Sequence, residues 1–307
     1  MGSPIFAVPV LEALIEASHD VLAVYSSPDR PSGRGNKTSA TAVKQAAIKH
    51  GLWVRQPASL NSKTEQDGIS DLNPELIVVA AYGLLLPIKV LETPDFSCLN
   101  IHPSLLPRFR GPSPVSTAIF EGVEMTGVTI MQLDSGVDTG PIVSQISTKI
   151  GAEETGASLT DRLFRLGANL LIDVIPAWTK GCIQGDVQDE SKATNTRLLA
   201  RKDGLVDWTK SADQIAQQVR AYTPWPGSHT KWLGKNLKII EAFPDEHDID
   251  DWSEGMVIGV GEERGILVGT GKGILRVTAL QLEGGSSMDG QDFIHGHNSI
   301  IGSILGE

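Results

Sequence analysis

Apolar residues along the chain follow two successive patterns. In the first part, short apolar runs alternate with segments that repeat every three or four residues, which is typical of strands alternating with helices in a parallel sheet. The nearly continuous run from Leu76 to Ala81 predicts a strand covered on both faces. The predicted strands are 21–25, 76–81, 97–101, 127–132 and 142–146, and the predicted helices are 8–16, 40–49 and 114–120.

The clearest helical pattern follows Ser158. Ser158 and Asp161 resemble a capping box with Asp in place of the usual Glu, so we expect the helix to begin there. The spacing indicates one buried face that packs in the core rather than a partner site. The residues of this face are Leu159, Leu163, Leu166, Leu170 and Val174.

A second pattern begins after residues 182–202, which are polar, lack a sustained period and are interpreted as a linker. Ser211 and Gln214 predict another capping box, and the sequence of 224–227 ends the helix that follows. Five short strands with glycine-rich turns then fit a small closed barrel. They are 228–232, 237–243, 255–260, 265–268 and 274–282. We therefore expect two domains, at 1–181 and 203–307.

Composition narrows the class of protein. The chain has 307 residues, 40% of them hydrophobic, which suits a globular protein with two cores. Cys98 and Cys182 argue against a disulfide framework and fit a reducing compartment. His295 and His297 lack further ligands nearby, so we expect a tail loop there and no metal. The apolar runs are too short to span a bilayer, and we expect a bacterial cytoplasmic protein without membrane association.

Two segments carry residues suited to acyl transfer. The first contains Asn100 and His102, and the second contains Asp138. An amide can polarise a carbonyl, an imidazole can move a proton, and a carboxylate can orient the imidazole and favour its charged form. Each residue alone also has an ordinary structural interpretation, as a hydrogen-bonded histidine or a turn aspartate. Their order and separation favour a site, whereas the protonation state in which His102 acts stays open.

The same segments resemble those of the formyltransferases that use 10-formyltetrahydrofolate. Further similarity lies in residues 2–14, 28–35, 81–83, 127–131, 224–227 and 280–285. The resemblance implies an α/β fold with a Rossmann-like, mostly parallel sheet that carries helices on both faces. A small OB-fold-like β-barrel that contacts tRNA would follow it.

The resemblance also implies roles for individual residues. Asn100, His102 and Asp138 would be catalytic. The folate would contact Ser104, Leu105, Leu106, Pro107, Ala80 and Tyr82, although Leu105 and Leu106 also fit a simple core role. The loop that enters the tRNA would present Arg30, Arg34 and Lys37. Because the formal net charge is −11, RNA binding requires such a local basic cluster.

The implied reaction transfers the formyl group of 10-formyltetrahydrofolate, a co-substrate, to the α-amino group of methionyl initiator tRNA. A monomer without metal would carry it out, in translation initiation. A formyltransferase for a UDP-linked 4-amino sugar shares the Asn-x-His motif, but the basic loop argues against it. A formate-releasing hydrolase and a non-catalytic RNA-binding relative are further alternatives, and the intact catalytic trio disfavours the last.

Two features depart from the family pattern. Its members begin with a buried strand of roughly six residues ahead of the loop that starts at Gly2. Here Met1 abuts Gly2, so we expect that strand to be missing through a misassigned start codon or a truncation. Residues 201–307 also contain more acidic than basic residues, which is unusual for a domain that contacts RNA.

Overall fold

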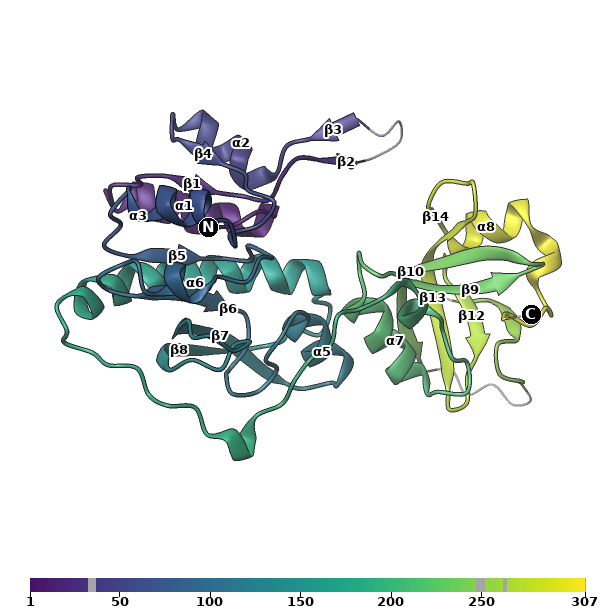
Figure 1. Cartoon of the computed structure of the whole chain (residues 1–307). Coiled ribbons are helices and arrows are strands. Elements are labelled where there is room, and N and C mark those ends of the chain that lie inside the picture. The colour runs from purple at the N-terminus through teal and green to yellow at the C-terminus, as the bar shows by residue number, and fades with distance from the viewer. Residues whose placement is uncertain (33–36, 247–251, 262–263, 307) are drawn as a thin grey trace. The chain divides into compact units, whose positions relative to one another are not determined.

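The chain folds into two compact units, each built from more than one stretch of sequence (Figure 1). The computed structural model describes residues 1–32, 37–246, 252–261 and 264–306. Unit 1 consists of Met1–Pro114, Met125–Lys149 and Thr160–Thr196. Unit 2 consists of Val115–Glu124, Ile150–Leu159 and Arg197–Glu307.

Unit 1 contains short strands separated by helices. The helices are α1 (Val8–Glu16), α2 (Ala42–Lys49), α3 (Lys63–Ser70), α4 (Ile88–Leu91) and most of α6 (Gly156–Thr179), with a 3-10 turn at Ile5–Ala7. The strands are β1 (Val24–Tyr25), β2 (Arg30–Ser32), β3 (Lys37–Ser39), β4 (Val54–Arg55), β5 (Ile77–Val79), β6 (Cys98–His102), β7 (Met125–Gln132) and β8 (Ile142–Lys149). The predicted helix 8–16 is confirmed at both ends. The β2–β3 hairpin, β4, α3 and α4 were not predicted.

The central sheet of unit 1 has the order β5-β6-β7-β8 and is mixed. The pair β5–β6 is parallel, whereas β6–β7 and β7–β8 are antiparallel. A separate parallel pair, β1–β4, and a parallel bridge between Gly2 and Ala80 extend the parallel part. The expectation of a mostly parallel sheet therefore applies to one half only, since β7 pairs antiparallel with both of its neighbours.

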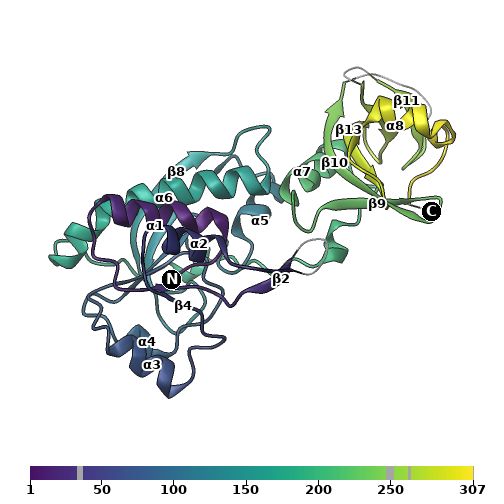
Figure 2. The same cartoon turned by 90° about the horizontal axis from the view of Figure 1, so that it is seen from above.

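Helices cover both faces of this sheet, with α1 and α6 on one side and α3 and α4 on the other (Figure 2). A Cβ atom at Gly167 of α6 would lie 2.6 Å from Cγ2 of Ile101, so α6 packs closely on the face that carries Ile101. The Cys98 sulfur lies 3.8 Å from the Val90 carbonyl oxygen of α4, on the opposite face. Because side chains alternate along a strand, Asn100 and His102 share the face of Cys98 and point away from α6.

Helix α6 begins two residues before Ser158. Thr155 and Ser158 form the reciprocal cap, because Ser158 Oγ accepts from Thr155 N at 2.9 Å and Thr155 Oγ1 accepts from Ser158 N at 3.2 Å. The predicted box of Ser158 and Asp161 is therefore wrong. Asp161 pairs instead with Arg165, one turn later, at 2.8 Å.

Unit 2 is built around an antiparallel sheet with the order β11-β12-β13-β10-β9, to which β14 adds beside β13. Its helices are α5 (Pro114–Phe120), α7 (Ala212–Ala221) and α8 (Gly290–Gly296), with 3-10 turns at Arg201–Gly204 and Asn298–Ile300. Its strands are β9 (Ser228–Trp232), β10 (Lys235–Asp245), β11 (Val257–Val260), β12 (Ile266–Gly269), β13 (Ile274–Leu282) and β14 (Met288–Asp289). Within the described residues, no ladder joins β9 to β11.

Several local predictions for unit 2 can be compared with the structure. The capping box is confirmed, since Ser211 Oγ accepts from Gln214 N and Gln214 Oε1 accepts from Ser211 N, both at 3.2 Å. The predicted bounds of β9 and β13 are also correct. The tail loop expected around His295 is wrong, because this residue lies in α8. Burial of Phe293 and Ile294 on the sheet explains why a helix forms there.

A groove of about 960 Å³ lies between β1 and β5 in unit 1. Met1 and Gly2 close one end of it, since Ala80 N donates to the Met1 carbonyl and Gly2 N donates to the Tyr25 carbonyl, both at 2.9 Å. In a parallel sheet, successive residues of a strand bond alternately to the strands on its two sides, as Met1 and Gly2 do here. The groove therefore has the geometry of a gap that one further strand would fill. Its apolar walls include Leu14, Val24, Ile69, Ile77 and Ile175.

We expect an apolar segment of about six residues ahead of Met1 to raise the melting temperature, because such a strand spans ~20 Å and would cover both apolar walls. It would also replace the Met1 amine, which donates to the Val78 carbonyl at 2.6 Å and whose pKa is lowered by burial to about 5. Calorimetry should compare this variant with one that carries a Gly-Ser segment of equal length. Equal melting temperatures for the two variants would contradict the expectation.

Candidate functional site

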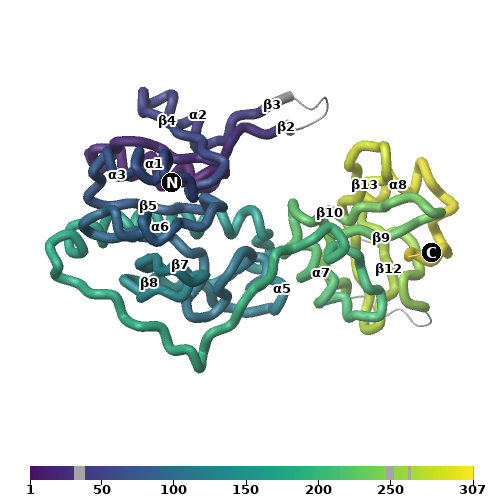
Figure 3. The backbone as a smooth tube through the Cα atoms, in the orientation of Figure 1, coloured from purple at the N-terminus to yellow at the C-terminus, as the bar shows by residue number. Residues whose placement is uncertain are grey.

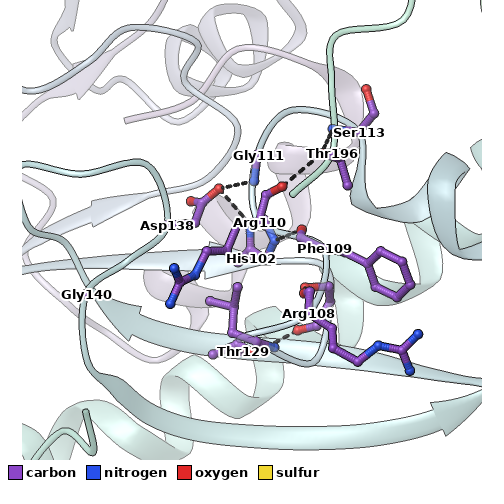
Figure 4. A network of polar contacts seen from close by, with 12 residues as sticks. His102, Arg108, Phe109, Arg110, Gly111, Ser113, Thr129, Asp138, Gly140 and Thr196 are labelled. Carbon is purple, nitrogen blue, oxygen red and sulfur yellow. Dashed lines mark hydrogen bonds and ion pairs between the residues drawn. The ribbon is translucent and has the colours of Figure 1, made fainter. Parts of the chain in front are cut away.

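His102 stands at the end of β6, where the strand runs into a buried loop (Figure 4). Its side chain is 5% exposed. Nε2 lies 2.9 Å from the carbonyl oxygen of Phe109, and Nδ1 lies 3.6 Å from Oδ2 of Asp138. A carbonyl oxygen can only accept a hydrogen bond. Nε2 therefore carries a proton and donates a hydrogen bond to the Phe109 carbonyl oxygen. In the neutral imidazole, Nδ1 is then the free basic nitrogen.

Burial dominates the electrostatics of His102. Desolvation lowers the pKa of the imidazole below its ordinary value, and this effect exceeds the opposing pull of the Asp138 carboxylate and the Phe109 carbonyl, which raise the pKa. The direction expected for Asp138 agrees with this, because the carboxylate raises the pKa, but burial has the larger effect. The carboxylate favours a proton on Nδ1, but the neutral ring is the form that burial favours.

A polar network on the neighbouring strand holds the loop after His102. Thr129 of β7, opposite His102 in the ladder, donates through Oγ1 to the Ser104 carbonyl at 2.6 Å and accepts from Leu106 N at 3.1 Å. Gln145 of β8 donates to the Leu106 carbonyl at 2.8 Å. Ser104 Oγ donates to the Arg108 carbonyl at 2.7 Å. These bonds give the loop a defined course up to the Phe109 carbonyl that His102 contacts.

Asp138 lies in the loop between β7 and β8. Asp134 begins this loop as an Asx turn, accepting from Gly136 N at 3.0 Å and from Thr139 Oγ1 at 2.8 Å. Asp138 itself has a φ of 55°, a strained value for a residue with a side chain. Its Oδ2 accepts from Gly111 N at 2.7 Å. One carboxylate oxygen therefore faces both His102 and the loop that follows it.

Residues 186–196 also contribute to the site. In Figure 3 the tube that follows α6 turns back along unit 1, and bridges join Asp186 to Ile142 and Asn195 to Arg110. Thr194 Oγ1 accepts from Phe109 N at 2.8 Å, and Gln188 is buried against Arg110. Gln188 and Thr194 were not predicted, because a polar segment without a period shows no sign of burial. Arg110 was not predicted either.

The remaining predicted catalytic and folate residues lie close by in the fold. Asn100 is buried on β6, two residues before His102 and on the same face. Leu106 is buried, whereas Leu105 is half-buried and lies over Gly127 of β7. The cis peptide between Leu106 and Pro107 lies in this loop. Ala80 follows β5 and is covered by Gly2.

Tyr82 lies within the core rather than on an open surface. Its side chain belongs to a buried cluster with Tyr25, Leu60 and Val90, and burial raises the pKa of its hydroxyl to about 12. Its backbone carbonyl accepts from the hydroxyl of Ser27 at 3.3 Å. If Tyr82 contacts a ligand, its backbone is therefore better placed to do so than its hydroxyl.

The predicted basic loop forms the β2–β3 hairpin, in which Arg30 is exposed. Arg34 and the side chain of Lys37 lie outside the described residues. At the base of the hairpin, Asp29 accepts from Lys44 and from Gln56, each at 2.6 Å, and these bonds lower the pKa of its carboxyl. The hairpin is therefore anchored to α2 and to the segment after β4.

The described residues contain no group of three or more His, Cys, Asp or Glu side chains arranged to hold a metal ion. None of their helices has the length and apolar character needed to cross a membrane.

Comparison with known families and proteins assigns both parts of the chain. Residues 1–175 match the family model described as Formyl transferase, and residues 198–298 match the one described as Formyl transferase, C-terminal domain. The methionyl-tRNA formyltransferase of Pseudomonas paraeruginosa is 40% identical over 308 residues, covering 100% of this chain and 98% of that protein. The enzyme of the same name from Methylococcus capsulatus is 42% identical over 305 residues, covering 99% and 98%.

Solved structures show the same α/β fold with a C-terminal antiparallel domain. An N-formyltransferase from Helicobacter canadensis, in complex with folinic acid and dTDP-3-aminofucose, aligns with a TM-score of 0.65 and 17% identity, over 90% of this chain and 96% of that chain. A sugar 3N-formyltransferase, solved with dTDP and 5-N-formyl-THF, gives 0.65 and 16%, over 93% and 97%. At these identities the similarity concerns the fold alone.

The geometry predicts how His102 titrates. Its pKa should lie below the ordinary histidine value of ~6.5, and Asp138→Asn should lower it further, because the substitution removes the negative charge that raises it. NMR of protein with labelled histidines, assigned with His102→Gln, measures both values. Asp134→Asn is the matched control from the same loop and should leave the pKa of His102 unchanged. A rise of the pKa in Asp138→Asn would contradict the electrostatic account.

Proposed function

The chain belongs to the formyl transferase family, and on this premise we propose that it transfers the formyl group of 10-formyltetrahydrofolate to the α-amino group of methionyl initiator tRNA. The observation that most directly supports this activity is the buried His102, held between the Phe109 carbonyl and the Asp138 carboxylate with Nδ1 free to accept a proton. Relatives that are 40–42% identical over nearly their full length bear the name of this activity. They are bacterial, which supports a bacterial cytoplasm as the place of the reaction.

The proposed chemistry follows from where protons and charge must go. The attacking amine loses a proton as it bonds to the formyl carbon, and neutral His102 accepts this proton at Nδ1. The charged ring is then stabilised by Asp138 at 3.6 Å and by the Phe109 carbonyl. The same proton is later given to the leaving nitrogen of the folate, which restores the neutral ring.

Asn100 has a different proposed role. Its amide, on the same face of β6 as His102, would donate to the formyl oxygen as negative charge develops there. Loss of one such donor typically costs ~10²–10³ in rate. Unlike a charged group, an amide can be buried at the end of a strand without the full cost of desolvating an ion.

We propose that the folate lies against the loop of Ser104, Leu105, Leu106 and Pro107 and against the backbone near Ala80 and Tyr82. The formyltransferase structures solved with 5-N-formyl-THF and with folinic acid support this class of co-substrate. Ser104 has its hydroxyl engaged with Arg108, so its contribution would come from the shape of the loop. This position lies at the carboxyl end of β5 and β6, where ligands of open α/β sheets bind.

We propose that tRNA contacts the β2–β3 hairpin through Arg30, Arg34 and Lys37, and also the domain at 203–307. The antiparallel strands of that domain would form an OB-fold-like barrel. The part before 182 would act as a Rossmann-like catalytic domain in a monomer, with 182–202 between the two. The family match of residues 198–298 supports a distinct C-terminal domain.

A formyltransferase that acts on a nucleotide-linked amino sugar is the competing assignment. The solved structures of that class share the fold but are only 16–17% identical. The formylation assay should therefore offer 10-formyltetrahydrofolate with charged initiator tRNA, elongator Met-tRNA and a UDP-linked 4-amino sugar in parallel. We expect transfer to initiator tRNA only. Transfer confined to the sugar, or no transfer by folded protein, would overturn the proposal.

Arg30 offers a test of the tRNA contact. If Arg30 binds a phosphate, Arg30→Ala should weaken binding of charged initiator tRNA and reduce the salt slope of the logarithm of the affinity by about one. Lys49→Ala is the control, because it removes the same charge from an exposed position at the end of α2. Filter binding over a range of salt concentrations measures both. Identical slopes for the two variants would exclude a phosphate contact by Arg30.

A further inference from the structure

The segment between α6 and α7 places one buried carboxamide against both loops of the site. Gln188 is 5% exposed. Its Nε2 donates to the carbonyl oxygens of Asp138 at 2.9 Å and Gly140 at 2.7 Å. Its Oε1 accepts from Nε and Nη2 of Arg110, at 3.0 and 2.9 Å. Since carbonyls only accept and a guanidinium only donates, these contacts require a side chain with a donor end and an acceptor end.

The contacts of Gln188 lie at the strained turn that contains Asp138. A left-handed residue with a side chain is strained and persists only where its surroundings hold it. Asp138, with a φ of 55°, is such a residue. The two N–H groups of Gln188 bind the carbonyl of Asp138 and that of Gly140 two residues later. At Gly140, an added Cβ would collide with the Gln132 carbonyl, so this end of the turn is also fixed by close packing.

Arg110 completes a closed set of contacts around Asp138. The next residue, Gly111, donates its N–H to Asp138 Oδ2 at 2.7 Å, so side chain and backbone of Asp138 are both tied to the 110–111 segment. The Arg110 side chain is 5% exposed, and its outer nitrogens bond to both oxygens of Glu190 at 3.0 and 2.7 Å. Glu190, 73% exposed, balances the charge from the surface, whereas Gln188 carries the contact inward.

We propose that Gln188 is a positioning residue, which holds the turn at Asp138 so that its carboxylate faces Nδ1 of His102. The kinetic part of this inference rests on the proposed function. Without Gln188, two carbonyls lose their donor and the guanidinium keeps only Glu190, so the turn is free to relax toward ordinary backbone angles. The carboxylate would then move away from the imidazole, while the folate loop, held by Thr129 and Gln145, keeps its own bonds.

The test compares Gln188→Ala with Gln188→Glu, which keeps the length and the acceptor for Arg110 but loses the donors to the two carbonyls. In both variants kcat should fall by up to ~10²-fold, as expected for a misplaced catalytic group, while the KM for folate stays within about twofold. In Gln188→Ala the acid limb of the pH profile of kcat should also move to lower pH, because His102 loses the charge that raises its pKa and no new charge is introduced. Glu190→Gln is the control and should keep wild-type kcat, since it leaves the four bonds of Gln188 in place.

Three outcomes would overturn the proposal. They are wild-type kcat in both Gln188 variants, equal losses of kcat and folate affinity, and a pH profile that does not move. The NMR titration of His102 needs no turnover and should show a lower pKa in Gln188→Ala than in the wild type. If wild-type protein transfers no formyl group, the proposed function fails, yet this titration still decides whether Gln188 positions Asp138. An unchanged pKa in a folded variant would reject that role.

Discussion

One carboxylate, that of Asp138, joins the two loops on which the site depends. Strand β6 carries His102 at its carboxyl end, but the strand alone cannot orient an imidazole or supply a charge beside it. The β7–β8 loop provides both, because Asp138 Oδ2 bonds to Gly111 N and faces His102 Nδ1. The strained backbone of Asp138 aims the side chain inward and therefore requires the packing of its neighbours.

The competition between burial and charge decides the state of His102. Two unit charges about 4 Å apart attract by ~4 kcal/mol at an effective dielectric constant near 20, whereas moving an ion out of water costs several kcal/mol. At His102 desolvation is the larger effect, so the pKa falls although Asp138 Oδ2 lies 3.6 Å from Nδ1. A neutral imidazole can accept a proton at Nδ1, where the neighbouring carboxylate stabilises the charge that develops.

The sequence predicts elements whose packing leaves a periodic trace. Helix 8–16 and strands 228–232 and 274–282 agree with the structure, because one face of each is buried and the pattern records it. Helix α3 gives no such periodic pattern, because Ile69 is the single residue of this helix that is buried. The trio of Asn100, His102 and Asp138 was found through motifs, and the structure places His102 beside Asp138. What the motifs could not show is the balance of burial over charge at His102 or the left-handed turn at Asp138, both of which arise from residues distant in sequence.

Gln188 marks the limit of pattern-based interpretation. A polar stretch without a period has the same composition whether it crosses solvent or is bound to the site through side-chain hydrogen bonds, because buried polar groups are matched to individual partners rather than to a face. Residues 186–196 contain Gln188, buried between Arg110 and the Asp138 turn, and also Glu190, which is largely exposed. A polar segment at the end of unit 1 can therefore be tied to the candidate site, and mutations in it need to be judged by their partners rather than by its composition.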